Sequence, residues 1–413
     1  MRFCIHRAAS QVGGNCIEVE AGGHSILLDL GLPLGAEKAS PALLPSVLGI
    51  DGSQRGNVLA VVLSHPHQDH YGLLVCANPD WPVYVAAGAE RLLRAAAFFT
   101  STAEIPQRVV PYGPRSPFLI GPFTITAFPV DHSAYEAYCL LIEADGKRLL
   151  YSGDFRLHGR KSRVMDALLR DPPKDVDVLL MEGTVIGRED AAFRSSEALL
   201  EADIVRTASS LRGLVLTSFS PQNIDRLVTF FRAALRSRRT LVVDAYTAHV
   251  LDALGLDSLP SARTSDRMRV FLPRSQKLRI LRTGRFDLIE PYRRRRIYAS
   301  ELNANPGRWL CLFRASMCSD FDELTCLRGA VLLYSLWPGY LRQDERLRNW
   351  VRRHGIDLQV KHTSGHAYTP DLIRFAKSIA PRRLVPIHSS HPERYEWLFR
   401  NVTRVPDGIW SEV

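Results

Sequence analysis

Short runs of β-branched and leucine residues, each closed by turn residues, dominate the first 186 positions. They occupy residues 14–20, 24–31, 57–65, 82–87, 122–132, 137–154 and 175–184. Runs of this length and composition predict strands, and Asp145-Gly146 between two apolar runs predicts a hairpin turn. Apolar residues at helical spacing predict a helix over 88–100 and another directly after residue 72. This part of the chain therefore predicts sheets packed with helices, in an α/β or α+β fold.

From about residue 187 the sequence pattern changes to an alternation of longer helices and strands. The pattern predicts a helix over 195–211, a strand over 213–219, a helix over 223–237 and a strand over 240–246. This βαβ rhythm favours a parallel sheet of its own. After residue 355 we expect a strand over 358–366, a helix over 370–380, a strand over 383–389 and a helix over 392–401. A length of 413 residues also favours two domains, or one domain with a large insertion.

Charge is distributed unevenly along the chain. The net charge is +10, and residues 187–355 alone contain 29 arginine and lysine residues against 18 acidic residues. All of these cations except Lys277 are arginines, whose planar guanidinium matches the geometry of a phosphate group. A polyanionic partner is one interpretation of this segment. The other is a solvated, arginine-rich surface. The run Arg293–Arg296 could bind a phosphate backbone, although a run of four arginines is more often a solvated face.

Cysteine usage and the hydropathy pattern limit the class of protein. The seven cysteines contain no CxxC pair, so they predict neither a disulfide framework nor a cysteine zinc site. The amino terminus lacks the apolar run of a signal peptide, and no stretch of about 18 uncharged apolar residues occurs. We therefore expect reduced cysteines, no membrane association and a cytoplasmic location.

Side chains that can bind metal ions gather where the expected strands end. They are His65, His67, Asp69 and His70 after the strand at 57–63, then His132, Asp154, Glu182, His366 and His388 at or after five later strands. Strands that end at the same edge of a sheet would bring these groups to one rim. A lone histidine or aspartate in such a place is usually structural. Three imidazoles and a carboxylate within six positions are costly to bury without a metal, so this cluster predicts a metal site.

The ligand types indicate which metal and which chemistry to expect. Imidazole and carboxylate together suit Zn2+, with Mn2+ as the alternative. Two such ions about 3.5–4 Å apart can stabilise both the attacking and the leaving oxygen in a displacement at phosphorus. His65 and His67 can point the same way from an extended segment, while Asp69 and His70 can face a second ion. The chain has no GxxxxGK[ST], GxGxxG or GxSxG motif, which leaves phosphate-loop nucleotide hydrolysis and serine acyl transfer without support.

Seven motifs in order resemble those of the metallo-β-lactamase superfamily. "SHPHQDHYG" at 64–72, Asp29 in "LLDLGLP", His132 in "PVDHS" and Asp154 in "YSGDF" are similar to its four general motifs. Glu182 in "MEGT", His366 in "HTSGHA" and His388 in "VPIHS" are similar to the three motifs of its nucleic-acid-processing β-CASP branch. "GLVLTSFSPQNIDRL" resembles the start of the inserted domain in ribonuclease J and its archaeal relatives. The resemblance covers essentially the whole chain.

This resemblance implies a fold and a domain division. The fold would be a metallo-β-lactamase αββα sandwich with an inserted β-CASP α/β domain. Residues 1–186 and 356–413 would form the metallo-β-lactamase domain, and residues 187–355 the β-CASP domain. The chain ends 25 residues after His388, so we expect the compact form of the family.

The resemblance also implies a role for each motif residue. One zinc ion would be bound by His65, His67 and His132, a second by Asp69, His70 and His388, and Asp154 would bridge the two. Asp69, His366 and Glu182 are the candidate catalytic residues, with His366 as proton donor supported by Glu182, and Asp29 would provide structural support. The weaker candidates for binding substrate phosphate are Ser220, Asn223, Ser364 and Gly365. Tyr368 stands where the ribonuclease J motif has serine, beside the pocket for a 5′ phosphate.

The implied function is a two-zinc phosphodiesterase that cleaves RNA to 5′-phosphate and 3′-hydroxyl products. A histidine at the position of His388 is typical of the RNA enzymes of the family, whereas the DNA-repair relatives usually have valine. The sequence leaves open 5′-to-3′ exonuclease or endonuclease action, the target RNA and homodimer formation. Three alternatives also stay open: a single-stranded DNA exonuclease of the same fold, a small-molecule metallo-hydrolase, and a metal-free RNA-binding scaffold.

Overall fold

The computed structural model describes residues 1–100, 105, 107–188 and 195–413. The chain divides into two compact units. Unit 1 combines Met1–Ala191 with Gly365–Val413, and unit 2 is Ala192–Ser364.

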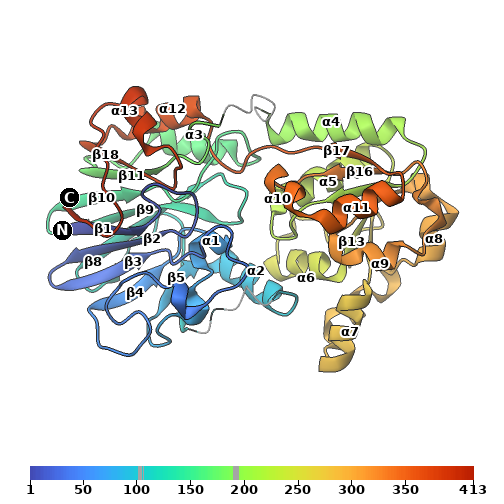
Figure 1. The fold of residues 1–413 in the computed structure, drawn as a ribbon, viewed down its shortest axis with the longest axis horizontal. Helices are drawn as coiled ribbons and strands as arrows, with labels where there is room; N and C mark the ends of the chain where they lie inside the picture. The colour runs from blue at the N-terminus through green and yellow to red at the C-terminus, as the bar shows by residue number, and fades with distance from the viewer. Residues whose placement is uncertain (101–104, 106, 189–194) are drawn as a thin grey trace. The chain divides into compact units, whose positions relative to one another are not determined.

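Unit 1 contains two mixed sheets (Figure 1). The first has seven strands in the order β19-β1-β2-β3-β4-β5-β6. Their bounds are β1 Arg2–Arg7, β2 Cys16–Ala21, β3 His24–Leu28, β4 Val58–Val62, β5 Val83–Ala86, β6 Val109–Tyr112 and β19 Trp410–Glu412. The second has six strands in the order β18-β11-β10-β9-β8-β7. Their bounds are β7 Phe118–Ile120, β8 Phe123–Val130, β9 Ala137–Ala144, β10 Lys147–Tyr151, β11 Val178–Glu182 and β18 Arg383–Ile387.

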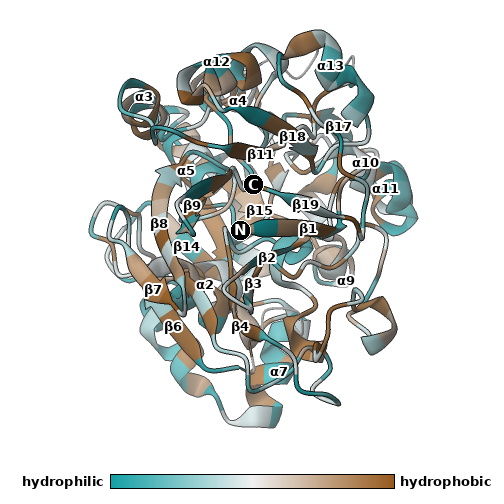
Figure 2. Cartoon of the chain, turned by 90° about the vertical axis from the view of Figure 1, so that its left-hand side faces the viewer, coloured by the Kyte–Doolittle hydropathy of each residue, from teal (hydrophilic) through white to brown (hydrophobic). Residues whose placement is uncertain are grey.

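Helices cover the outer faces of these sheets, in the αββα arrangement expected from the sequence. They are α1 Gln68–Tyr71, α2 Ala87–Ala97, α3 Ser162–Arg170, α12 Thr369–Ile379 and α13 Tyr395–Leu398. One core packs Met165 and Leu168 of α3 and Phe375 of α12 against Leu150 and Leu179 of the six-stranded sheet. Both α3 and α12 alternate hydrophobic and hydrophilic residues (Figure 2), because only one face of each helix is buried.

Unit 2 is built on one parallel sheet of six strands in the order β14-β13-β15-β12-β16-β17. The strands are β12 Val215–Ser218, β13 Thr240–Asp244, β14 Met268–Phe271, β15 Trp309–Leu312, β16 Val331–Tyr334 and β17 Asp357–Val360. The helices are α4 Glu197–Ser210, α5 Ile224–Arg236, α6 Ala245–Leu254, α7 Arg274–Thr283, α8 Ala299–Ala304, α9 Cys318–Phe321, α10 Pro338–Gln343 and α11 Glu345–Arg353. Every strand pair in this sheet is parallel, which confirms the sheet type that the βαβ rhythm predicts.

The sequence pattern misses several strands. Strands β1, β6, β7 and β19 of unit 1 and β14, β15 and β16 of unit 2 were not expected, since they are short or carry weak apolar patterns. The helix expected over 392–401 is limited to a 3-10 turn, Pro392–Arg394, followed by α13. Within the described part of the chain, no helix is long and apolar enough to cross a membrane.

The second domain boundary also differs from the expected one. Residues 356–364 were assigned to the metallo-β-lactamase domain, but they belong to unit 2. The physical reason is that β17 pairs in parallel with β16, from Val331 opposite Asp357 to Tyr334 opposite Val360. The expected strand over 358–366 therefore ends at Val360, and the rest of that segment is the connection back to unit 1.

Candidate metal centre

The carboxyl ends of strands in unit 1 carry the candidate ligands. His65 follows β4, and His67 precedes the single-turn helix α1, which contains Asp69 and His70. His132, Asp154 and His388 follow β8, β10 and β18, and Glu182 is the last residue of β11. His366 lies in the loop that leads into α12. The structure brings all nine side chains into three groups of potential ligand atoms.

The first group consists of His65, His67 and His132. Their ligand atoms all lie within 4.8 Å of one another, and the ring centroids are separated by 4.7–4.9 Å. His132 Nε2 and His67 Nδ1 face each other at 3.1 Å. Two ring nitrogens at this distance either share one proton in a hydrogen bond or bind a common ion.

The second group consists of Asp69, His70, Asp154 and His388, again within 4.8 Å of one another. His70 Nε2 lies 3.1 Å from Asp154 Oδ2, and His388 Nε2 lies 3.7 Å from the same oxygen. Asp154 Oδ2 is also 3.8 Å from His65 Nε2 of the first group. Asp154 is thus the carboxylate that touches both groups.

A third group joins Asp154 to Glu182 and His366. His366 Nδ1 lies 3.3 Å from Glu182 Oε2 and 3.7 Å from Asp154 Oδ2. The side chain of His366 is 22% exposed, whereas that of Glu182 is fully buried. His366 can therefore be reached from solvent while its partner carboxylate is held inside.

Asp29 holds the first two groups in place through a dense set of hydrogen bonds. Its carboxylate accepts from the Ser64 backbone N–H at 2.7 Å, the Ser64 hydroxyl at 2.7 Å and the Tyr151 hydroxyl at 2.6 Å. It also contacts His70 Nδ1 at 2.7 Å, which leaves Nε2 pointing toward Asp154. Such outer contacts fix the orientation of a ligating imidazole.

Asn15 is a residue at the site that the sequence pattern did not identify. Its side-chain oxygen lies 2.6 Å from His388 Nδ1, and its amide nitrogen donates to Tyr151 at 3.0 Å. His388 itself adopts a positive φ of 48°, a strained conformation for a residue with a side chain. A hydrogen bond from its backbone N–H to the Ala8 carbonyl, at 2.7 Å, secures that conformation. The only signal in the sequence is a polar residue in a glycine turn, which is common in loops.

Gly365 contributes to the site through its backbone. Its carbonyl oxygen lies 2.6 Å from His132 Nδ1, which directs His132 Nε2 toward the first group. A Cβ atom at this position would come within 2.5 Å of the Ser133 hydroxyl, so the close approach requires glycine. Gly365 was expected to bind phosphate, and this contact gives it a role in orienting His132.

Burial sets the protonation states of the histidines. It lowers the pKa of four of them, that of His67 to about 4; the others are His65, His132 and His388. These rings are therefore neutral near pH 7, the form that binds a metal ion. Burial alone would also lower the pKa of His70, but Asp154 and Asp29 outweigh it and raise that pKa well above its usual value.

Two further pKa shifts concern the third group. Burial alone would raise the pKa of Asp154, but His388, His70 and His366 outweigh it and hold it well below the usual range. Burial would likewise lower the pKa of His366, but Glu182 and Asp154 outweigh it and raise it. The centre therefore combines an ionised carboxylate with a histidine that tends to carry a proton.

Several buried atoms of the cluster lack any hydrogen-bond partner among the described residues. They are His65 Nε2, Asp154 Oδ1 and His388 Nε2. An unpaired buried polar atom costs about 1–3 kcal/mol, so three converging ones indicate a missing ligand. Neutral imidazole nitrogens and an ionised carboxylate are the donors that Zn2+ and Mn2+ accept. The residues present therefore fit a metal centre.

The remaining phosphate-binding candidates lie in unit 2. Asn223 precedes α5, and its side-chain oxygen accepts from the Arg226 backbone N–H at 2.9 Å. The Ser220 hydroxyl accepts from the Gln222 backbone N–H at 3.3 Å, and Ser364 is the last residue of the unit. Ser220 and Asn223 thus have local roles in a turn and a helix cap, and phosphate binding by these residues stays a prediction.

Tyr368 lies in unit 1, immediately before α12. Its ring stacks on that of His158, with the ring centroids 4.2 Å apart and the planes inclined by 17°. The tyrosine that replaces the family's serine is therefore packed against a neighbouring loop and half-buried.

Comparison with known proteins gives two family matches. Residues 24–212 match a β-lactamase superfamily domain, and residues 356–395 match a Zn-dependent metallo-hydrolase RNA specificity domain. The Ribonuclease J of Mycoplasma pneumoniae is 24% identical over 92% of this chain and 66% of that protein. The Ribonuclease J of Sinorhizobium meliloti is 25% identical over 88% of this chain and 63% of that protein. The chain thus spans slightly less than two thirds of the length of these relatives.

A solved structure of similar fold covers the full length. A protein of unknown function from Enterococcus faecalis V583 superimposes with a TM-score of 0.79 over 99% of both chains, at 21% identity. Both units of the fold are therefore found together in another protein. The two family matches and the Ribonuclease J relatives together support a metallo-β-lactamase, β-CASP ribonuclease J-like protein.

Proposed function

We propose that this protein is a two-metal phosphodiesterase that hydrolyses RNA, leaving 5′-phosphate and 3′-hydroxyl ends. The observation that carries the proposal is a pair of adjoining ligand groups: Asp154 belongs to the second and lies 3.8 Å from His65 of the first, and buried atoms of both groups lack hydrogen-bond partners among the described residues. A binuclear centre is the arrangement that stabilises in-line displacement at phosphorus.

The contacts support an assignment of the ligands. His65, His67 and His132 would hold one ion, Asp69, His70 and His388 would hold the second, and Asp154 would contribute to both. Zn2+ suits the five imidazoles and two carboxylates, and Mn2+ is the alternative. Asp29 and Asn15 orient His70 and His388 from behind.

The surrounding side chains supply the proton transfers. The two ions, when bound, provide Lewis acidity and lower the pKa of water. Asp69, whose side chain is 21% exposed, accepts the proton from the attacking water. The bond between phosphorus and the 3′ oxygen then breaks, and His366 gives its proton to that oxygen. Glu182 keeps His366 protonated and fixes the ring.

The names of the relatives and the charge of unit 2 support RNA as the substrate. Two relatives are named Ribonuclease J, and the match at 356–395 is described as an RNA specificity domain. Arginine is also strongly concentrated in residues 187–355. Both 5′-to-3′ exonuclease and endonuclease action are compatible with this centre.

The test is incubation with 5′-labelled and internally labelled RNA and matched DNA, with Zn2+ or Mn2+ added. We expect RNA cleavage and 5′-phosphate products; mononucleotides would indicate an exonuclease and discrete fragments an endonuclease. Products with a 3′ phosphate would contradict the mechanism. If the protein cleaved DNA but not RNA, the substrate would be DNA. Hydrolysis of small thioesters or lactams without any nuclease activity would overturn the proposal.

A substitution of His366 separates proton donation from metal binding. His366→Gln should lower the cleavage rate by about 10²–10⁴-fold, as expected for loss of a general acid. The metal content, measured by mass spectrometry, should stay at the wild-type value. A leaving group that needs no proton, such as p-nitrophenol on a thymidine 5′-phosphate ester, should restore most of the rate. Failure of this substrate to restore the rate would contradict the assignment of His366 as donor.

A further inference from the structure

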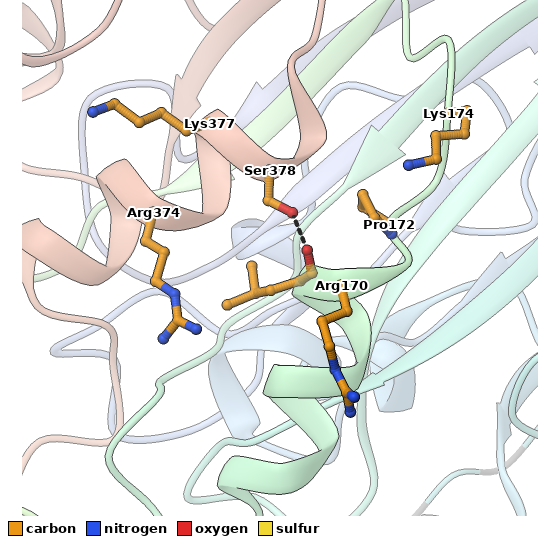
Figure 3. Close-up of a pocket in the computed structure, with 7 residues that line it drawn as sticks. Arg170, Pro172, Lys174, Arg374, Lys377 and Ser378 are labelled. Atoms are coloured by element: carbon orange, nitrogen blue, oxygen red, sulfur yellow. Dashed lines mark hydrogen bonds between the residues drawn. The ribbon is translucent and has the colours of Figure 1, made fainter.

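Two cation-rich surfaces occur outside the metal centre, and the one in unit 1 has a structural explanation. A cavity of about 440 Å3 is lined by four cations (Figure 3), namely Arg170, Lys174, Arg374 and Lys377. Arg170 and Lys377 lie in the last turns of α3 and α12, where cations offset the helix dipole. The Ser378 hydroxyl donates to the Leu169 carbonyl at 2.7 Å and joins the two helices (Figure 3). The two helix ends explain this surface, and its cations serve as the control in the binding experiment below.

The other surface is the exposed stripe of α7 in unit 2. The inner side of α7 is fixed by Ile280, which is buried, and by Gln276, whose amide donates to Asp244 at 2.6 Å. The opposite side repeats at positions 274, 277, 278, 281 and 282, the spacing of one helix face. These positions carry Arg274, Lys277, Leu278, Leu281 and Arg282, all exposed. An exposed face that alternates cations with leucines is unusual for a solvated helix.

The segment that follows α7 continues the same chemistry. Residues 274–296 contain nine arginine and lysine residues and only two acidic ones, Asp287 and Glu290. Phe286 is 53% exposed directly after the helix, and Arg293 is 80% exposed. We call residues 274–296 the basic arm. Within the arm Asp287 pairs with Arg285 and Glu290 pairs with Arg293, and the arm keeps a net charge of +7, nine cations less two acidic residues.

We propose that the basic arm is a docking strip for single-stranded RNA, in addition to the metal centre. Its arginine and lysine side chains bind phosphates, and Leu278, Leu281 and Phe286 contact the bases. The proposal rests on the proposed function for the choice of RNA. Single-stranded nucleic acids bind where a row of cations follows the backbone and an exposed aromatic ring accepts a base. A helix of 10 residues is about 15 Å long, enough for two or three successive phosphates.

An anionic membrane surface is the competing partner, and the arm fits it less well. Membrane-surface helices bury a broad apolar face into the lipid. The outer face of α7 offers only two leucines, interrupted by cations on both sides. Narrow apolar contacts between charges suit bases attached to a phosphate chain.

The experiment measures binding of a fluorescent 12-nucleotide oligouridylate over a range of NaCl concentrations, in an Asp154→Asn background so that the RNA stays intact. The arm variant is Arg274→Gln/Lys277→Gln/Arg282→Gln, and the control is Arg170→Gln/Lys174→Gln/Lys377→Gln, which removes the same charge from unit 1. Loss of three phosphate contacts should reduce the slope of log affinity against log salt by about 2. The control should keep the parental slope. Equal slopes in the arm variant and the parent, or an equal loss in the control, would overturn the proposal.

A second pair of measurements tests base contact. Phe286→Ala should weaken oligouridylate binding about tenfold, a typical value for one stacked base. The affinity for inorganic polyphosphate of the same charge should not change. Loss of binding to phosphatidylserine vesicles in the arm variant, with RNA binding intact, would make the arm a membrane contact instead. Wild-type RNA cleavage is assayed separately, so that absence of cleavage would contradict the proposed function without affecting the slope comparison.

Discussion

Both units bury charged side chains, but among the described residues the ligand groups of unit 1 include atoms without partners, whereas those of Asp244 and Arg226 in unit 2 are all paired. In unit 2, Asp244 ends β13 and accepts from Thr247, Gln276 and Arg314. Arg226 donates to Glu197 at 2.9 Å, to the Ser335 hydroxyl at 2.6 Å and to the Thr363 carbonyl at 3.3 Å.

This difference in hydrogen bonding distinguishes a ligand site from a structural network. The buried nitrogen and oxygen atoms of Asp244, Glu197 and Arg226 all have partners, whereas those of His65, Asp154 and His388 include atoms with none among the described residues. A satisfied network of opposite charges stabilises a fold. A convergent, unsatisfied set of neutral imidazoles and carboxylates requires a cation. The following substitutions test whether the two units differ in this way.

The largest effect is expected from Asp154→Asn in unit 1. Loss of the carboxylate shared by both ligand groups should lower the metal content per chain and reduce RNA cleavage by about 10³-fold or more. Metal content is measured by mass spectrometry, and cleavage with labelled RNA. Asp166→Asn, an exposed carboxylate on α3, is the control and should change neither. Wild-type metal content in the Asp154 variant would show that the cluster is a structural network like that of unit 2.

Arg226→Ala addresses the satisfied network of unit 2. The substitution removes the guanidinium that offsets the buried charge of Glu197, whose Oε2 still accepts from the Thr229 hydroxyl, and should lower the free energy of unfolding of unit 2 by about 3–5 kcal/mol. Urea unfolding followed by circular dichroism measures this change. Arg206→Ala breaks an exposed ion pair with Asp203 on α4 and should cost less than about 1 kcal/mol. Equal costs for the two variants would contradict the distinction between buried and exposed pairs.

A smaller effect is expected from Asn15→Ala, which touches only the outer contacts of the metal centre. Loss of the hydrogen bond to His388 Nδ1 should weaken metal affinity by about 10–100-fold. Competition with a chromogenic chelator provides the affinity. Asn78→Ala removes a side-chain hydrogen bond to the Gly49 carbonyl elsewhere in unit 1 and serves as control. An unchanged affinity in the Asn15 variant would mean that His388 is oriented by its backbone alone.

The smallest effect concerns acid stability in unit 2. Burial alone would raise the pKa of Asp244, but Arg314 and Thr247 outweigh it and lower the pKa below its usual value of 3.8. A carboxyl whose pKa is lower in the folded state stabilises the fold above pH 4, and this contribution is lost as the pH falls further. Arg314→Gln should therefore flatten the dependence of urea stability on pH below about pH 4. An equally steep dependence in the variant would assign the acid sensitivity to other carboxyls.

The sequence predicts most of the strands because their apolar runs are short and end in turn residues. It misses β1, β6, β7 and β19, which lie at or near the edges of the unit 1 sheets, and also the four-residue strands β14, β15 and β16 of unit 2. It also assigns residues 356–364 to unit 1, because a short apolar run does not reveal which sheet it joins. Only the parallel pairing of β17 with β16 decides that question.

The candidate ligands follow from the sequence because two local facts determine them. Residues 65–70 place four ligating side chains within six positions, and the other candidates lie at strand ends that share an edge. The orientation of each ring depends on contacts far apart in the chain, such as Asn15 with His388 across 373 positions and His132 with Gly365 across 233. No periodic pattern records such pairs, because they arise only when separate strands pack. The sequence alone therefore determined which residues gather, and the tertiary structure decided which atoms face one another.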